Sequence, residues 1–269
     1  MKRHKVSERR ACKVVDLHRS TLRYEGSTSE FEDRLVVRMT ELSEKYPFYG
    51  YKKIWALLRR EGWAVNRKRV ERLWRLHGLT HPPAQASGKP AEGSIDNAVW
   101  KVRAEHPNHV WAYDFVTDRT KDGKRFRVLN VVDEFTREGI FSCAERSIGA
   151  TRVREVLAEL VQKRGCPKYI RSDNGREFIA ATIAEFLDQR GIQTLFIEKG
   201  RPQQNGICER YNGLMRTELL NAEEFGSMLE ARVLIRDWVK HFNTKRPHSA
   251  LGNSTPVEFR TRWTGSTPE

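Results

Sequence analysis

The stretch KYIRSDNGREF, residues 168–178, contains a short apolar run that ends at an aspartate followed by Asn and Gly. A carboxylate at the end of a buried strand is costly unless its charge is compensated. Asp173-Asn174-Gly175 is a good turn sequence in which the aspartate caps the backbone. The alternative is that Asp173 meets a cation at the edge of a sheet, and residues elsewhere in the chain must decide between the two.

Two further acidic residues favour the cation. Asp114 lies in the strand-like run VWAYDFVTD, residues 110–118, and Glu209 opens a helical pattern, with 35 residues between Asp173 and Glu209. Strand ends and helix starts can converge at one edge of an α/β sheet. Three converging carboxylates repel one another unless a cation lies among them. Mg²⁺ prefers oxygen ligands, and two such ions can hold the attacking and leaving oxygens of a phosphodiester. We therefore expect Asp114, Asp173 and Glu209 to be catalytic and to bind two Mg²⁺ ions, for which Mn²⁺ would substitute.

The segment KGRPQQNGICERYNGLMRTELL, residues 199–220, surrounds Glu209 with side chains suited to holding a DNA backbone. A basic residue also follows Glu209 by seven positions, nearly two helical turns along the same face. A solvated helix end would explain the same composition. The DNA contacts expected here are Lys199, Arg201, Gln204, Asn205 and Arg216.

Other groups compete for the chemistry. Asp118 and Asp133 are rival carboxylates, ranked lower because neither has an amide-rich context. Tyr211 and Ser172 adjoin the proposed acids and are alternative nucleophiles. With carboxylates able to bind metal, however, a water or a DNA 3′-hydroxyl is the more economical attacking group.

The charge of the chain indicates a polyanionic partner. Its 269 residues carry a net charge of +14, with a pI of about 9.8. Residues 1–80 contribute 20 Lys and Arg against 10 Asp and Glu. Nucleic acid is the expected partner and an anionic membrane the rival. No run reaches the length of a membrane span and no signal peptide is evident, so a cytoplasmic protein is expected.

Metal binding outside the acidic residues is not expected. The four cysteines are scattered without a CxxC pair and are predicted to be reduced and idle or buried, with Cys208 serving in packing. His106 and His109 have a ligand-like spacing, but Pro107 interrupts the helix that such a site would use.

Helical patterns fill residues 1–80. Ser7 is predicted to cap a helix with Ala11, Val14 and Val15 on its inner face, and a second helix follows in residues 19–24. A clearer helix pair covers residues 49–62 and 66–78.

The last of these helices combines an apolar stripe with a basic face. The predicted inward stripe is Val70, Leu73, Trp74 and His77. The predicted outward basic face is Arg67, Lys68, Arg69, Arg72 and Arg75. Such a face suits a helix laid in a DNA groove, and a solvated face is the alternative.

Beyond a Pro-, Gly- and Ser-rich stretch the pattern changes. Strands are predicted in 110–118, 125–136, 139–146, 168–173 and 192–198, and helices in 150–165 and 176–191. This order predicts a mixed α/β sheet with flanking helices. We expect a DNA-binding region at 1–80, a linker at 81–105, a catalytic core at 106–225 and a helical tail at 226–269. In the tail, Trp238 and Phe242 are expected to dock on the core, whereas Arg246 and His248 either dock or contact DNA.

The motifs HVWAYDFV, LNVVDEFTR, RSDNGREF and FNTKRPHSALGNSTPVEF, with the segment around Glu209, resemble the second-frame (OrfB) transposases of the IS3 family of insertion sequences. Residues 41–62 and 69–82 resemble the helix-turn-helix region of that family, so the resemblance covers nearly the whole chain. The spacing of Asp114, Asp173 and Glu209, with Arg216 beyond, is the hallmark of the group.

The resemblance implies an RNase H-like fold, similar to retroviral integrase cores, and a two-metal DNA strand-transfer reaction. Water would free a 3′-hydroxyl at an element end, and that hydroxyl would attack another phosphodiester, with a circular intermediate before integration. It further implies DNA partners, namely the terminal repeats and the target, and the upstream-frame OrfA product, either separate or fused to this chain. Homo-oligomers on DNA and a bacterial, nucleoid-associated location are also implied. The alternatives are a catalytically silent DNA-binding regulator and a metal-dependent nuclease that does not join ends.

Overall fold

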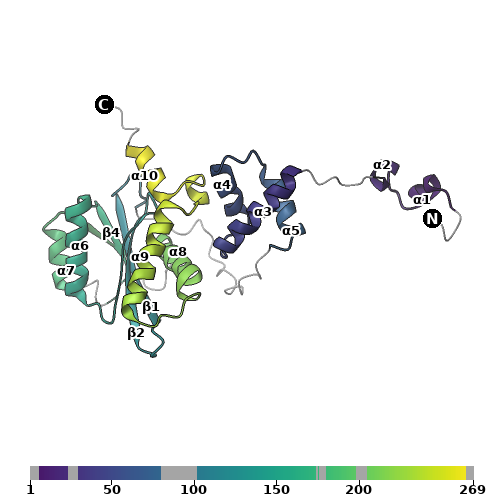
Figure 1. The fold of residues 1–269 in the computed structure, drawn as a ribbon. Helices are drawn as coiled ribbons and strands as arrows, with labels where there is room; N and C mark the ends of the chain where they lie inside the picture. Colours follow the sequence, from purple (N-terminus) through teal and green to yellow (C-terminus); the bar gives the residue numbers. More distant parts are fainter. Residues whose placement is uncertain are drawn as a thin grey trace. The chain divides into compact units, whose positions relative to one another are not determined.

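The computed structural model describes residues 6–23, 30–79, 102–173, 175, 180–197 and 205–264. The chain divides into two compact units, Met1–His81 and Pro82–Glu269 (Figure 1). The expected linker at 81–105 lies outside the described residues except for its last four positions. Each unit is treated separately below.

The N-terminal unit is helical. Its helices are α1 (Glu8–Val14), α2 (Arg19–Leu22), α3 (Glu30–Lys45), α4 (Tyr51–Arg60) and α5 (Arg67–Leu76). Helices α3, α4 and α5 share one hydrophobic cluster, to which Leu35, Leu58 and Trp74 contribute fully buried side chains. The pair α4 and α5 confirms the sequence prediction, including Asn66, whose Oδ1 accepts a 2.8 Å hydrogen bond from the Arg69 backbone at the start of α5. Helix α3 was not predicted.

Two predicted inner faces need correction. Val14 and Val15 are 79% and 67% exposed, and Cys12 is the buried residue of α1. The reason is that α1 faces α2 with the side that carries Glu8 and, one turn later, Cys12. Arg19 and Arg23 donate hydrogen bonds to the Glu8 carboxylate on that side. In α5, His77 is exposed because it is the C-cap residue, beyond the point where the helical period holds.

The C-terminal unit is built on a five-stranded sheet. Its strands are β1 (Val110–Arg119), β2 (Arg125–Asp133), β3 (Gly139–Glu145), β4 (Tyr169–Ser172) and β5 (Gln193–Phe196). They lie in the order β3-β2-β1-β4-β5, in which β1 to β3 are antiparallel while β4 and β5 run parallel to β1. This mixed sheet with flanking helices confirms the predicted fold class.

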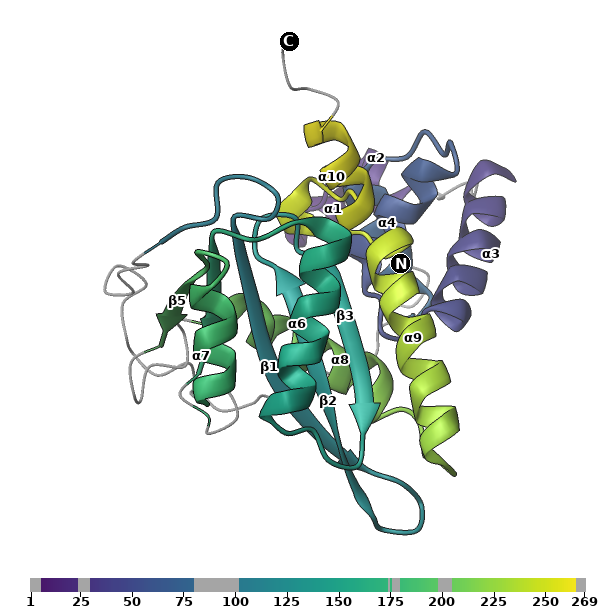
Figure 2. The same cartoon turned by 90° about the vertical axis from the view of Figure 1, so that its left-hand side faces the viewer.

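Two helical layers cover the sheet (Figure 2). On one face α6 (Ala150–Arg164) and α7 (Ala181–Asp188) pack against Trp111 and Tyr113 of β1. On the other face α8 (Gly206–Met215), which continues into a π-helical turn at Arg216–Leu220, and α9 (Met228–Thr244) pack against Ala112 and Val116. Alternate residues of β1 thus point to opposite layers, as the two-residue period of a strand requires.

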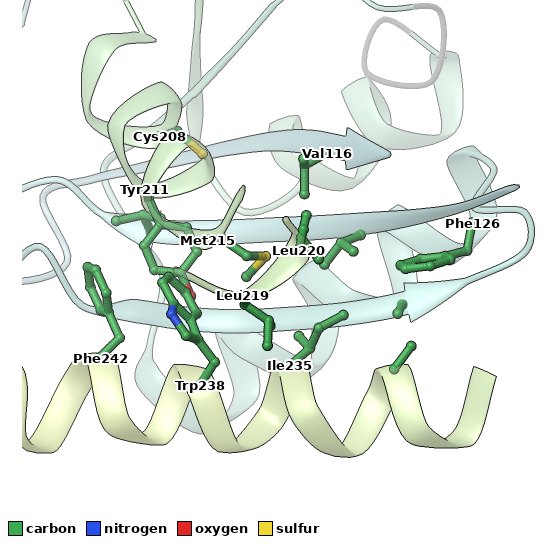
Figure 3. Close-up of a cluster of buried hydrophobic side chains, with 14 of the residues drawn as sticks. Val116, Phe126, Cys208, Tyr211, Met215, Leu219, Leu220, Ile235, Trp238 and Phe242 are labelled. Atoms are coloured by element: carbon green, nitrogen blue, oxygen red, sulfur yellow. The ribbon is translucent and has the colours of Figure 1, made fainter. Parts of the chain in front are cut away.

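The C-terminal segment is part of this core. Trp238 and Phe242 of α9 enclose the buried ring of Tyr211 from α8, at centroid distances of 5.3 and 4.8 Å (Figure 3). Their predicted docking is confirmed. A 3₁₀ turn at Ser249–Leu251 and α10 (Pro256–Thr264) follow. No helix among the described residues has the length and apolar character needed to cross a membrane.

Candidate active site

The parallel pairing of β1 and β4 brings two of the predicted acids level with each other. Ala112 pairs with Arg171, and two residues further along each chain stand Asp114 and Asp173. Neighbouring strands lie about 4.8 Å apart, and residues two apart share a face. Asp114 is therefore placed between Ala112 and Val116 on the sheet face that α8 covers.

Electrostatics tie Glu209 to the same place. Burial, and to a lesser extent the charge of Asp173, raises the pKa of Asp114 to about 6. Partial burial and the charge of Asp114 raise the pKa of Glu209, in the first turn of α8. Asp114 thus interacts electrostatically with each of the other two carboxylates.

Asp173 also makes the turn that its sequence suggested. Its Oδ1 accepts a 2.9 Å hydrogen bond from the Gly175 backbone. Asp173 therefore caps the turn, as the first of the two sequence interpretations proposed, and it also lies near Asp114. The turn uses Oδ1, and Oδ2 accepts no hydrogen bond from the described part of the chain.

A buried polar network orients the Asp114 carboxylate. Asn212 of α8 donates from Nδ2 to Asp114 Oδ2 at 2.9 Å, and the Phe115 backbone donates to Oδ1 at 2.7 Å. Asn130 of β2, which pairs with Asp114 across the sheet, donates to Asn212 Oδ1 at 2.7 Å. Ser142 of β3 donates to Asn130 Oδ1 at 2.6 Å. Because each amide accepts at its oxygen, its NH₂ group is directed toward the next residue, and the last NH₂ group points at Asp114.

Sequence reasoning missed this network. Asn130 is fully buried in the middle of the apolar run VLNVVD, residues 128–133. A lone amide in such a strand requires a hydrogen-bonding partner, and that is the signal that was available. Its partner Asn212 follows Glu209 by three residues on α8, a spacing that places the two side chains near one another on the helix surface.

The donor set fits a hard divalent cation. All three acids offer carboxylate oxygens, and their mutual repulsion is the condition that a cation relieves. Over the residues that the structure describes, no three His, Cys, Asp or Glu side chains are close enough together to form a complete metal-binding group.

The competing groups have structural partners. Asp133 is 2% exposed and accepts backbone hydrogen bonds from Asn108, Phe135 and Thr136 at 2.7 to 2.9 Å. Asp118 accepts from the Arg119 backbone. The rival nucleophiles Tyr211 and Ser172 are both buried.

The packing predicted for Cys208 is also seen. It is fully buried, and burial raises the pKa of its thiol well above the usual range. His109 Nδ1 accepts from the Glu105 backbone, and the rings of His106 and His109 stack at 4.5 Å.

The predicted DNA contacts near Glu209 fall into two groups. Lys199, Arg201 and Gln204 lie outside the described residues. Asn205 is 3% exposed, and its Oδ1 has no hydrogen-bonding partner in the part of the chain that is described. Arg216, at the end of α8, donates to the Thr117 carbonyl at 2.6 Å, which holds its guanidinium beside β1.

The basic face of α5 is partly compensated by acids. Arg72 pairs with Glu32 of α3 at 2.6 Å, and Arg69 approaches the same carboxylate at 3.5 Å. Arg75 pairs with Glu71 at 2.7 Å. Arg67 and Lys68, in the first turn of α5, are exposed.

In the tail, Arg246 and His248 are buried. Arg246 is 4% exposed and forms a 2.7 Å ion pair with Glu218 of the π-helical turn. The ring of His248 packs edge-on against Phe242 at 4.6 Å. These contacts support docking, the first of the two interpretations of this segment.

A five-stranded mixed sheet with acids on β1, after β4 and on α8 defines an integrase-type catalytic core. Two models described as integrase core domain match residues 104–202 and 190–256, and one described as HTH-like domain matches residues 30–86. A chain of the simian T-cell lymphotropic virus intasome shares the fold, with a TM-score of 0.52, 16% identity, and coverage of 86% of this chain and 75% of that one.

Proteins of bacterial insertion elements are similar to this chain in sequence. A 31.7 kDa protein of insertion element IS407 from Burkholderia multivorans is 35% identical over 254 residues, covering 94% of this chain and 90% of the relative. The putative transposase InsK of IS150 from Escherichia coli is 25% identical over 260 residues, covering 92% and 91%. The chain belongs to the IS3-type family of insertion-element transposases.

Proposed function

We propose that this chain cuts DNA at the ends of its insertion element to free a 3′-hydroxyl and then joins that hydroxyl to another DNA strand. One observation carries the proposal: Asp114 stands level with Asp173 on adjacent parallel strands, and its charge raises the pKa of Glu209 on α8. Acids from three separate elements would then hold the phosphodiester during in-line displacement.

Each acid has a role in this proposal. Asp114 and Asp173 would hold one Mg²⁺ between them, and Asp114 or Asp173 with Glu209 would hold a second; Mn²⁺ would replace either. The bound ions would supply charge neutralisation at the attacking and leaving oxygens. Asn212 is a positioning residue, because its amide hydrogen bond to Asp114 Oδ2 directs the other oxygen lone pairs.

DNA contacts are assigned to both units. The HTH-like unit would bind DNA through α5, with Arg67 and Lys68 reaching phosphates directly and Arg69, Arg72 and Arg75 exchanging their acidic partners for phosphates. In the catalytic unit, Lys199, Arg201, Gln204, Asn205 and Arg216 would hold the strand that reacts.

The partners follow from the same proposal. The reaction needs two element ends and a target, so we expect homo-oligomers assembled on DNA. The product of the upstream frame, OrfA, is the expected protein partner, either separate or fused to this chain. The first product would be a junction of the two element ends.

The test is to supply the complete element, with its ends and its upstream frame, to cells and to amplify across the joined ends. Wild type is compared with Asp173→Asn at matched protein level. Asp237→Asn on α9 is the matched control, because that carboxylate is 61% exposed and makes a 3.6 Å contact with Arg236. We expect junctions from wild type and Asp237→Asn and none from Asp173→Asn.

Other outcomes would select the alternatives. Junctions that persist undiminished in Asp173→Asn would remove this carboxylate from catalysis and with it the site assignment. DNA binding without any cleavage by wild type would identify a silent regulator. Cleaved ends that are never joined would identify a nuclease.

A further inference from the structure

A cavity of about 400 Å³ lies beside the first turn of α8. Its lining includes Ile207, two residues before Glu209, and Phe135 from the turn after β2. The neighbouring Glu134 backbone donates to the Val110 carbonyl at the start of β1. Asp114 is four residues further along β1, which corresponds to about 13 Å at 3.3 Å per residue. The cavity therefore adjoins the proposed active site without being part of it.

Two arginines, Arg103 and Arg137, line this cavity, and neither forms an ion pair in the described part of the chain. Arg137 has a left-handed backbone (φ 63°), fixed by a hydrogen bond from its N–H to the Asp133 carbonyl. In the described part of the chain its side chain donates no hydrogen bond. The nearby carboxylate of Glu134 is already paired with Arg171 at 2.7 Å. Arg171 also donates to the Val102 carbonyl at 2.7 Å, which anchors the segment that carries Arg103.

The two guanidiniums repel each other. Burial lowers the pKa of Arg137. The positive charge of Arg103 lowers it further, and the carboxylates of Glu134 and Asp133 oppose this. Guanidiniums match phosphate with paired hydrogen bonds, and a phosphate between them would relieve the repulsion. The lining carries two guanidiniums and one carboxylate, Glu134, which is itself paired with Arg171, so the cavity favours an anion.

Aromatic rings form the adjoining wall. Phe135 packs against Phe259 at 5.5 Å and against Trp263 at 4.8 Å between ring centroids. Trp263 is 46% exposed at the end of α10. Aromatic faces beside arginines are the combination on which unstacked nucleotide bases settle.

We propose that this cavity binds a single nucleotide of the reacting DNA strand, with its phosphate between Arg103 and Arg137 and its base on the Phe135, Phe259 and Trp263 surface. The inference rests on the proposed function for the presence of DNA. At a rise of about 3.4 Å per nucleotide, the cavity lies a few nucleotides from the reacting phosphodiester. The bound base would be unstacked from its neighbours, as at a frayed or flipped position.

The test uses the full chain in an Asp173→Asn background, so that binding is measured without reaction. Duplexes carrying the element end, with 2-aminopurine at successive positions near the cleavage site, report an unstacked base by fluorescence. We compare Arg103→Gln/Arg137→Gln with the charge-matched control Arg154→Gln/Arg236→Gln, two exposed arginines of α6 and α9. Thermal unfolding of each variant shows that it is folded.

We expect one or two positions to give a distinct signal that the control keeps and the Arg103/Arg137 variant loses, with about tenfold weaker DNA binding. A signal and affinity that are unchanged in the Arg103/Arg137 variant would overturn the proposal. So would the absence of any position-specific signal on DNA that is bound. Because neither readout requires joining, failure of the strand-transfer proposal would be seen separately, in the junction assay.

Discussion

Replacing Asn130 by Leu should disturb the orientation of the Asp114 carboxylate while leaving the carboxylate itself in place. Asn130 is fully buried and links Ser142 to Asn212 through hydrogen bonds of 2.6 and 2.7 Å. Leucine has neither donor nor acceptor, so the Asn212 amide would lose the contact that fixes its direction. It could then turn its oxygen toward the Asp114 carboxylate, where the two would repel.

The structure sets the size of both effects. A buried acceptor left without a donor costs about 1–3 kcal/mol, and the added apolar burial of leucine returns about 1–2 kcal/mol. The free energy of unfolding should therefore fall by no more than about 2 kcal/mol. The hydrogen bond from Asn212 to the charged Asp114 is worth about 1.5–3 kcal/mol. At about 1.4 kcal/mol per factor of ten, its loss should slow end joining about 10- to 100-fold.

The assay is single-turnover joining of element-end DNA by the purified protein over a range of Mg²⁺ concentrations, with urea unfolding measured in parallel. Ser142→Ala is the matched control, because it removes the outer member and leaves the bond from Asn130 to Asn212. Its rate should change by less than about threefold. If Asn130→Leu lost stability but kept the wild-type rate and Mg²⁺ dependence, the network would be structural only and the reasoning would be refuted.

Three other predictions concern stability. The pKa of Asp114 is raised to about 6 in the folded protein from 3.8, so ionisation of this carboxyl favours unfolding. The stability of the metal-free protein should therefore fall as pH rises from about 4 to 6. In urea titrations with EDTA, Asp114→Asn should remove about 2 kcal/mol of that fall. Replacing Arg246 by Ala should cost about 3–5 kcal/mol because it removes the buried ion pair with Glu218, whereas the Arg246→Met/Glu218→Leu pair should lose much less in the same titrations; equal losses would contradict this. Gly139→Ala should lower Tm by several degrees, since the new Cβ would lie 2.6 Å from Cε2 of the buried Tyr211 ring, and a Tm within 1 °C or so of wild type would refute the clash.

Local patterns were sufficient for most elements. The runs that start at Val110, Arg125 and Gly139 became strands because β-branched and aromatic residues continue without interruption between turns. Helix α5 was predicted with its Asn66 cap because that capping bond involves only residues close in sequence. The predicted burial of Val15 and His77 was wrong because the helical period was extended to the helix ends, where side chains face solvent instead of packing on a partner.

The acids of the candidate site divide in the same way. Asp114, Asp173 and Glu209 could be selected from sequence because each has a recognisable local setting and a characteristic spacing. The spatial arrangement of these acids could not be obtained from the sequence. Only the parallel register of β1 with β4 shows that Asp114 and Asp173 stand level, and only the placement of α8 brings Asn212 to the Asp114 carboxylate.

The sequence by itself determined the order of strands and helices, the acidic residues and the excess of positive charge, because these depend on residue types and short spacings. Tertiary structure alone decided that Ser142, Asn130 and Asn212 form one line to Asp114, since those side chains come from two strands and a helix whose register no local pattern records. It also decided that Arg246 is buried against Glu218, where its charge is used within the fold. The physical reason is that hydrogen bonds and ion pairs form between whatever side chains the packing of layers brings together, and that packing is settled by the chain as a whole.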